Sequence, residues 1–277
     1  MIITNAMRDE FAEKGYVVVP GFYDEGREVA PIREGARIII ARLADKYGIE
    51  APVDTPERAM SEGYRALIAK DRKIGGEVYD AVKQIPAFMR LVSKHENDEV
   101  FRALRPESVP GIAAGGYGIR IDNPGEEKFR AQWHQEFPSQ LRSIDGIVYW
   151  TPLIAVTQDM GPVQIAEGSQ AEGPIPVYSD SKGVGASGAY ALHLDRGEER
   201  LAKYKVVAPL SKPGDLILMD FMTMHQSGYN ISAIPRWSIQ FRYFNYADPV
   251  GTRIGWAGSF AAGVDFASVL PELVAAR

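Results

Sequence analysis

The sequence predicts an α+β protein in which a helix-rich first part precedes a mainly β core of sandwich or jelly-roll type. Apolar residues recur at helical spacing up to about residue 110. From about residue 111, short β-branched and aromatic runs alternate with turns that contain glycine or proline. Many short strands with such turns favour antiparallel layers over a parallel α/β sheet, in which strands and helices would alternate.

Up to about residue 110, the sequence predicts a helical scaffold with one early strand. Ile32, Ala36, Ile40 and other apolar residues recur at helical spacing, and Gly48 then ends the pattern as glycine often ends a helix. The expected elements are a helix at 5–15, a strand at 16–20, a helix at about 28–47 and an interrupted helical segment at 56–104.

The strands of the core are expected at 116–121, 146–153, 162–166, 204–207, 216–221 and 237–244. The irregular stretch at 172–200 interrupts them, and so long a loop is either functional, here as a lid over a site, or an ordinary surface excursion. A tail at 251–277, with a helix at about 266–276, closes the chain. No internal repeat or low-complexity tract appears. Residues 1–277 are therefore expected to form one domain, with a scaffold at about 1–110 and a core at about 111–250.

Composition excludes several classes of function. The formal net charge is −5 and no block of lysine and arginine occurs, so nucleic acid is not an expected partner. The chain has no cysteine, which excludes disulfides, thiolate zinc sites and cysteine nucleophiles. No apolar run approaches membrane-spanning length and no signal peptide is evident. We therefore expect a cytoplasmic protein with a small-molecule partner, and the sequence does not predict its oligomeric state.

His134, Glu136 and His225 form a candidate metal site. The first two lie two positions apart, and on a β-strand such residues point to the same face. His225 follows the apolar run at 216–219 and is the expected third donor. Two imidazoles and one carboxylate make the facial triad that binds non-haem Fe(II) and leaves positions open for substrate and oxygen.

The same residues have competing structural interpretations. Each histidine is alternatively a core residue with satisfied hydrogen bonds, and Glu136 is alternatively an ion-pair partner of Arg120 or Arg130. Arg236 opens the last predicted strand, where its guanidinium suits a carboxylate ligand. The competing interpretation of Arg236 is a surface ion pair.

Side chains on the stretches that flank the candidate metal site are expected to line a substrate pocket, although any one of them is as easily core or surface. Arg120 stands out, because a cationic side chain near the metal suits an anionic substrate. His95 and His193 are expected to lie on a solvated helix and in or near the long loop, respectively. The candidates for substrate contact are Tyr117, Arg120, Gln132, Trp133, Gln135, Phe137 and Tyr149.

Several motifs, taken in order, resemble one enzyme family. They are the Phe-x-x-x-Gly-Tyr-Val-Val-Val run at 11–19, Trp-His-Gln-Glu at 133–136, the Gly-Pro-Val-Gln-Ile run with Gly-Ser at 161–169, and the stretch from Gly-Asp-Leu to Arg at 214–236. In this order the chain resembles the phytanoyl-CoA dioxygenase family of Fe(II)/2-oxoglutarate oxygenases. The resemblance runs from about residue 11 to 246 and is weakest at 25–110 and 172–200.

This resemblance implies a double-stranded β-helix, the cupin-like jelly roll, with the N-terminal helices packed on its outside. It assigns Fe(II) to His134, Glu136 and His225, and the far carboxylate of 2-oxoglutarate to Arg236 with help from Ser227. Trp150 would line one side of the cosubstrate pocket. The implied reaction consumes O2 and 2-oxoglutarate and hydroxylates a small organic molecule, with release of succinate and CO2.

Two departures from the family pattern matter. The acidic ligand is normally aspartate and is Glu136 here, and the family's Gly-Ser-His reads Gly-Ser-Gln at 168–170. Glutamate remains a competent oxygen donor, and because it fills the position that related halogenases leave empty for chloride, halogenation is disfavoured. The alternatives are a non-oxidative metal-dependent isomerase or lyase of jelly-roll fold, and a degenerate family member that binds a small ligand without turnover.

Overall fold

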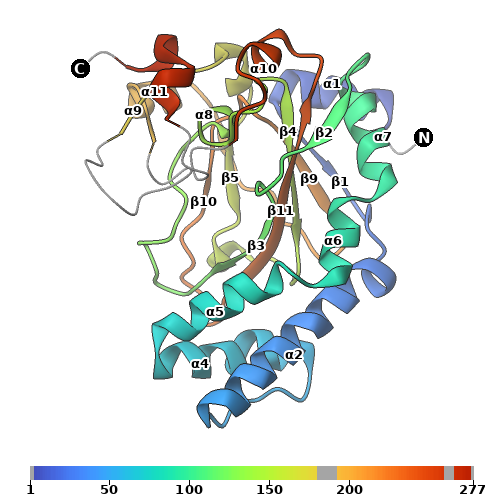
Figure 1. Cartoon of the computed structure of the whole chain (residues 1–277), viewed down its shortest axis with the longest axis vertical. Coiled ribbons are helices and arrows are strands. Elements are labelled where there is room, and N and C mark those ends of the chain that lie inside the picture. Colours follow the sequence, from blue (N-terminus) through green and yellow to red (C-terminus); the bar gives the residue numbers. More distant parts are fainter. Residues whose placement is uncertain (1–2, 180–191, 259–264, 276–277) are drawn as a thin grey trace.

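A six-stranded antiparallel sheet forms the centre of the molecule (Figure 1). The computed structural model describes residues 3–179, 192–258 and 265–275. The strands run in the order β1–β9–β4–β11–β2, and β3 also pairs with β11. Their bounds are β1 Tyr16–Val19, β2 Pro110–Ile112, β3 Gly118–Asp122, β4 Gly146–Pro152, β9 Leu216–Asp220 and β11 Arg236–Asn245.

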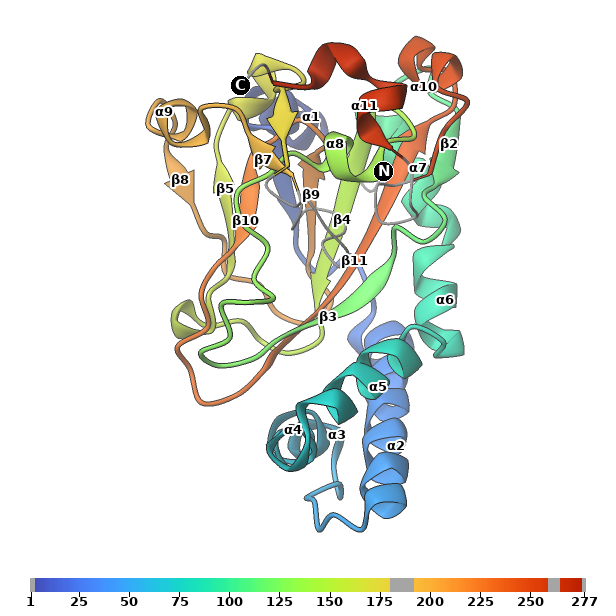
Figure 2. The same cartoon turned by 60° about the vertical axis from the view of Figure 1, so that its left-hand side comes forward.

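A smaller antiparallel sheet faces the large one (Figure 2). Its order is β10–β5–β8, with β10 at His225–Ser227, β5 at Val163–Ala166 and β8 at Val206–Val207. A third, two-stranded sheet pairs β6, Val177–Tyr178, with β7, His193–Leu194. The predicted combination of helices with an antiparallel β core is confirmed, whereas the double-stranded β-helix remains a prediction.

Helices cover one face and one end of the large sheet. Figures 1 and 2 show α2, α4 and α5 gathered at one end, with α6 and α7 beside the sheet. Gly15 and Gly48 follow α1 and α2 with φ of 75° and 61°, a left-handed conformation that glycine adopts without strain. The helices are α1 Asn5–Lys14, α2 Ala30–Tyr47, α3 Pro56–Arg58, α4 Tyr64–Lys70, α5 Arg72–Val82, α6 Pro86–Val92, α7 His95–Leu104, α8 Glu136–Gln140, α9 Gly197–Leu201, α10 Pro249–Arg253 and α11 Phe266–Val269.

The large sheet separates two apolar clusters. On β11, Trp237, Ile239, Phe241 and Tyr243 pack with the helices in one cluster. Side chains alternate along a strand, so Ser238, Gln240 and Arg242 lie on the opposite face, toward the smaller sheet. Trp150 of β4 and Met219 of β9 belong to the second cluster on that face. One face of the sheet is therefore filled by helices, and the other is left to carry polar groups.

The C-terminal helix is shorter than expected. The terminal helix expected at 266–276 ends at Val269, because a residue before proline disfavours helical backbone angles and Pro271 begins a separate 3-10 turn. Residue 276 lies outside the described residues, as does 180–191 of the expected lid, so the lid remains a prediction. The described ends of that stretch form β6, β7 and α9. The single-domain organisation likewise remains a prediction.

No helix among the described residues combines the length and the apolar character that crossing a bilayer requires.

A buried hydrogen-bond network ties α7 to the sheet through Asn97. Its side-chain oxygen accepts from the Tyr23 hydroxyl at 2.9 Å, and its amide nitrogen donates to the carbonyls of Leu91 and Val92 at 2.9 and 3.2 Å. The Tyr149 hydroxyl of β4 donates to the Asn97 carbonyl at 2.9 Å. The network satisfies polar groups that burial would otherwise leave without partners.

Replacing Asn97 by alanine is expected to lower the free energy of unfolding by about 3 kcal/mol, because the Tyr23 hydroxyl and two carbonyls lose a buried partner. Urea unfolding followed by circular dichroism measures the loss. The exposed Asn5→Ala is the control and should change stability by less than about 0.5 kcal/mol. Equal stability of the two variants would contradict a structural role for Asn97.

Candidate metal centre

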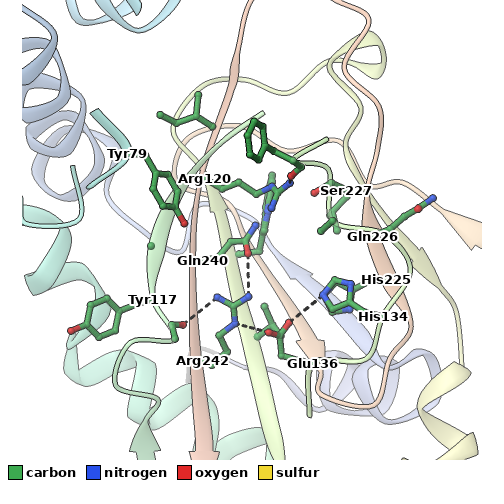
Figure 3. Close-up of a pocket in the computed structure, with 18 of the residues that line it drawn as sticks. Tyr79, Tyr117, Arg120, His134, Glu136, His225, Gln226, Ser227, Gln240 and Arg242 are labelled. Carbon is green, nitrogen blue, oxygen red and sulfur yellow. Dashed lines mark hydrogen bonds and ion pairs between the residues drawn. The ribbon is translucent and has the colours of Figure 1, made fainter. Parts of the chain in front are cut away.

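The structure brings His134, Glu136 and His225 together (Figure 3). One ligand atom from each residue lies within 4.8 Å of the others, and all three residues are buried. The Glu136 Oε2 atom lies 3.8 Å from His134 Nε2 and 3.4 Å from His225 Nε2. The expected cluster of two imidazoles and one carboxylate therefore exists in the fold.

The local structure that brings the three residues together differs from the predicted strand. His134 and Glu136 do not share a strand: His134 makes an isolated antiparallel bridge with His225, and Glu136 begins α8. Pro138 explains the difference, because it has no N–H for a strand ladder but fits the first turn of a helix. The two histidines exchange backbone hydrogen bonds of 3.1 and 3.0 Å, and the Glu136 N–H donates to the Phe221 carbonyl at 2.9 Å.

Both imidazoles are oriented by backbone carbonyls. The Nδ1 atom of His134 lies 2.7 Å from the Gln132 carbonyl oxygen, and that of His225 lies 2.9 Å from the Thr223 carbonyl oxygen. A carbonyl can only accept, so each Nδ1 carries a proton and donates it. Burial, followed by the proximity of His225, lowers the pKa of His134. Each Nε2 can then present a lone pair toward Glu136, which is the tautomer that a metal requires.

The Glu136 carboxylate is ionised and only half satisfied. Burial alone would raise its pKa, but the charge of Arg242 and then the two imidazoles hold the pKa well below its ordinary value. Arg242 Nε donates to Oε1 at 3.0 Å, whereas buried Oε2 accepts no hydrogen bond from the residues that the structure describes. A buried anionic oxygen facing two imidazole nitrogens fits a metal ion by its charge and by its donor set.

The ion pair of Glu136 differs from both sequence-based alternatives. Its partner is Arg242, whereas Arg120 pairs with Asp122 and Arg130 pairs with Glu127. Sequence reasoning missed Arg242. Alternation along the predicted strand at 237–244 was a usable signal, since it places the two polar residues Gln240 and Arg242 on the face opposite the aromatic ones.

The cluster lies in the wall of a cavity of about 480 Å³. Of the other predicted site residues, Tyr117, Arg120, Trp150 and Ser227 line this cavity. Lining residues that were not predicted include Tyr64 of α4, Arg72 and Tyr79 of α5, Gln226 of β10, and Gln240 and Arg242 of β11. The N-terminal helices thus contribute to the cavity as well as to the scaffold.

The remaining predicted site residues lie elsewhere among the described residues. Gln135 is buried and ties the turn before α8 to the carbonyls of Gly173 and Met222. Phe137 is in the apolar cluster between the sheets, with Trp133 packed against it, and Tyr149 faces the helices. Gln132 donates to Glu127 near the surface at 2.9 Å. None of these five lines the cavity, and neither does Arg236.

Arg236 is buried in a three-residue charge cluster. The β3–β11 register places it opposite Asp122, whose Oδ2 lies 2.7 Å from Arg236 Nη2. Arg120 contacts the same carboxylate, with Nη2 2.7 Å from Oδ1. Burial would raise the pKa of Asp122, but the two guanidinium groups lower it. The cluster therefore carries two positive charges and one negative charge, and only Arg120 of the three lines the cavity.

Similarity to known proteins is clearest at the level of family and fold. The sequence model of the phytanoyl-CoA dioxygenase (PhyH) family matches residues 11–238. No curated protein sequence matches the chain.

Several solved structures share the fold. EctD from S. alaskensis, with 2-oxoglutarate and 5-hydroxyectoine, is 21% identical, with 89% of this chain and 77% of that chain covered and a TM-score of 0.58. EctD with bound Fe is 21% identical, with 88% and 77% covered and a TM-score of 0.57. The non-haem alpha-ketoglutarate-dependent carbocyclase SnoK, from nogalamycin biosynthesis, is 15% identical, with 88% and 84% covered and a TM-score of 0.56. At these identities the likeness shows the fold alone.

Asp122→Asn is expected to lower the free energy of unfolding at pH 7 by about 3 kcal/mol, because it leaves the buried Arg236 and the partly buried Arg120 without their shared carboxylate. The folded-state pKa of Asp122 is depressed. Its contribution to stability is therefore present above the unfolded pKa of about 3.9 and is lost as pH falls through the folded pKa. The difference between variant and wild type should shrink in acid.

Denaturant unfolding at a series of pH values checks this expectation. Asp80→Asn is the matched control, because Asp80 forms an exposed pair with Lys83 and should contribute about 0.5 kcal/mol or less. A difference for Asp122→Asn that stays constant from pH 7 into the acid range would contradict the proposed electrostatic origin.

Proposed function

The chain belongs to the phytanoyl-CoA dioxygenase family, and on that basis we propose that it is an Fe(II)- and 2-oxoglutarate-dependent dioxygenase. The proposed reaction hydroxylates a small organic molecule, with O2 and 2-oxoglutarate consumed and succinate and CO2 released. The observation that carries the proposal is the buried cluster of His134, Glu136 and His225, whose carboxylate has an unsatisfied oxygen in the wall of a cavity. The proposed fold is the double-stranded β-helix.

His134, Glu136 and His225 would hold the iron. Two neutral imidazoles and one carboxylate leave a site with Fe(II) at net charge +1, which favours a further anionic ligand. Iron together with 2-oxoglutarate would supply the oxidising chemistry that inserts an oxygen atom into the substrate. The part played by the protein is to orient the donors, hold the cosubstrate and exclude water. The backbone carbonyls of Gln132 and Thr223 orient the donors, because each accepts a hydrogen bond from one imidazole ring.

The cosubstrate is proposed to bind between the metal and the cluster of Arg120, Asp122 and Arg236. Two guanidinium groups share one carboxylate there, so the cluster keeps a net positive charge that the far carboxylate of 2-oxoglutarate can balance. Ser227 and Trp150 line the same cavity and are proposed to donate a hydrogen bond and to form a wall, respectively. Arg236 already pairs with Asp122, so in the proposed complex its guanidinium would contact both Asp122 and the carboxylate of the cosubstrate.

The substrate is proposed to be a small molecule that occupies the rest of the cavity. A volume of about 480 Å³ is in the range of small-molecule sites. Tyr117 and Arg120 line it, which keeps both as candidates for substrate contact. A degenerate ligand-binding protein is supported only by glutamate in place of aspartate, and the proximity of a Glu136 carboxylate oxygen to both imidazoles, within 4.8 Å, counts against it. A non-oxidative lyase or isomerase would retain activity without oxygen.

Anaerobic addition of Fe(II) and then 2-oxoglutarate to metal-free protein tests cofactor and site together. A weak visible charge-transfer band should require both additions. The band should be absent in His225→Ala, which lacks one donor. In Arg236→Ala, half-saturation of the band should require at least about tenfold more 2-oxoglutarate. The reason is that a charge-assisted hydrogen bond contributes about 1.5–3 kcal/mol.

His95→Ala is the matched control, since His95 is an exposed helix residue paired with Glu99 and should leave the titration unchanged. A folded wild-type protein that binds metal without developing the band would exclude the oxygenase. Wild-type protein that binds no metal would leave only the non-catalytic ligand-binding alternative.

A further inference from the structure

Arg242 contacts the proposed iron ligand Glu136 and is itself held from three directions (Figure 3). Its Nε donates to Glu136 Oε1 at 3.0 Å. Its Nη1 donates to the Gly116 carbonyl at 3.1 Å, and its Nη2 donates to Gln240 Oε1 at 3.2 Å. Each nitrogen of the guanidinium thus has a protein partner, so the planar group has one orientation available to it.

This contact divides the two oxygens of Glu136 between two tasks. Oε1 is occupied by Arg242, whereas Oε2 lies toward the two imidazoles and accepts no hydrogen bond from the described residues. A carboxylate in this position can bind a metal through one oxygen or through both. With Oε1 engaged, only Oε2 remains to act as a donor.

A glutamate ligand needs more help to hold its carboxylate in one orientation than an aspartate ligand does. It has one more rotatable bond than the aspartate usual in the family, so its carboxylate reaches further and has more orientations to lose on binding a metal. Its carboxylate is also anionic and buried, which is costly without a positive partner. Arg242 meets both requirements, because it supplies the charge and is rigidly fixed to β11 and to the loop at Gly116.

We propose that Arg242 is a positioning residue that holds Glu136 as a one-oxygen ligand of the proposed iron. The inference rests on the proposed function, since it assumes a metal between His134, Glu136 and His225. A one-oxygen carboxylate keeps three of six coordination positions open, enough for a chelating 2-oxo acid and for oxygen. Arg242 thereby compensates for the longer acidic ligand.

Co(II) binding to metal-free protein tests the proposal without depending on turnover. Arg242→Met should bind Co(II) about tenfold to 100-fold more weakly, the usual loss when a group that orients a metal ligand is removed. Its visible Co(II) spectrum should also differ from that of the wild type, because the freed second carboxylate oxygen can take the place of a water on the metal. Arg242→Lys retains the charge but lacks the planar guanidinium. Its affinity for Co(II) should therefore lie between those of the wild type and Arg242→Met.

Arg200→Met is the matched control for the loss of a partly buried, ion-paired arginine. Arg200 lies in α9 and pairs with Glu172, and its side chain is 15% exposed against 13% for Arg242. It should bind Co(II) as wild type does. Circular dichroism and thermal melting establish that each variant is folded. An equal loss of affinity in Arg200→Met would overturn the proposal, because it would indicate a general loss of stability.

A double variant separates positioning from simple charge neutralisation. Glu136→Asp withdraws the carboxylate by about one carbon–carbon bond and removes the extra rotation. In that background, Arg242→Met should cost less than about threefold in Co(II) affinity, so the two effects should be non-additive. Equal fold-losses in both backgrounds would overturn the proposal.

The remaining outcomes distinguish this inference from the proposed function. Wild-type affinity and spectrum in Arg242→Met would overturn the role of Arg242 and leave the metal site standing. Wild-type protein that binds neither Co(II) nor Fe(II) would overturn both.

Discussion

The candidate site depends on the backbone pairing of His134 with His225. The two residues are far apart in the chain, and their mutual hydrogen bonds of 3.1 and 3.0 Å bring the imidazole centroids to 4.3 Å from each other. His225 pairs with Ile165 of β5 on one side, so this bridge attaches His134 to the other side of β10. The orientation of the donors is therefore a property of the smaller sheet, and a shift in its register would separate the triad.

The large sheet supplies the other half of the site through the alternation of β11. One set of its side chains packs under the helices, and the other set carries Gln240 and Arg242 into the cavity. Because the apolar set is fully buried, the strand has only one acceptable register, and the position of Arg242 follows from it. Packing of the core and orientation of the carboxylate ligand are thus linked through the same ten-residue strand.

The sequence was most informative where local rules determine structure. The helix expected at about 28–47 appears as Ala30–Tyr47, and the strand expected at 237–244 as Arg236–Asn245. The three residues of the metal cluster were recognised from residue type and from the family resemblance. The predicted strand at Glu136 is wrong, because Pro138 has no N–H for a strand ladder and fits the first turn of the helix that Glu136 begins. Asp122 is not evident from the sequence because its partner Arg236 comes from the pairing of two strands that lie far apart in the chain. Alternation places Arg242 on the polar face of its strand, but residue spacing does not reveal that its partner is Glu136 of α8.

Two parts of the chain, the β core and the N-terminal helices, line the cavity. The metal cluster and its supporting groups come from the β core, whereas Tyr64, Arg72 and Tyr79 come from α4 and α5. Substitutions in these two helices can reshape the outer wall without altering the donor set. For the proposed oxygenase, substrate range and reactivity can therefore change independently during evolution, and exchanging the helical segment among relatives is expected to alter the first without the second.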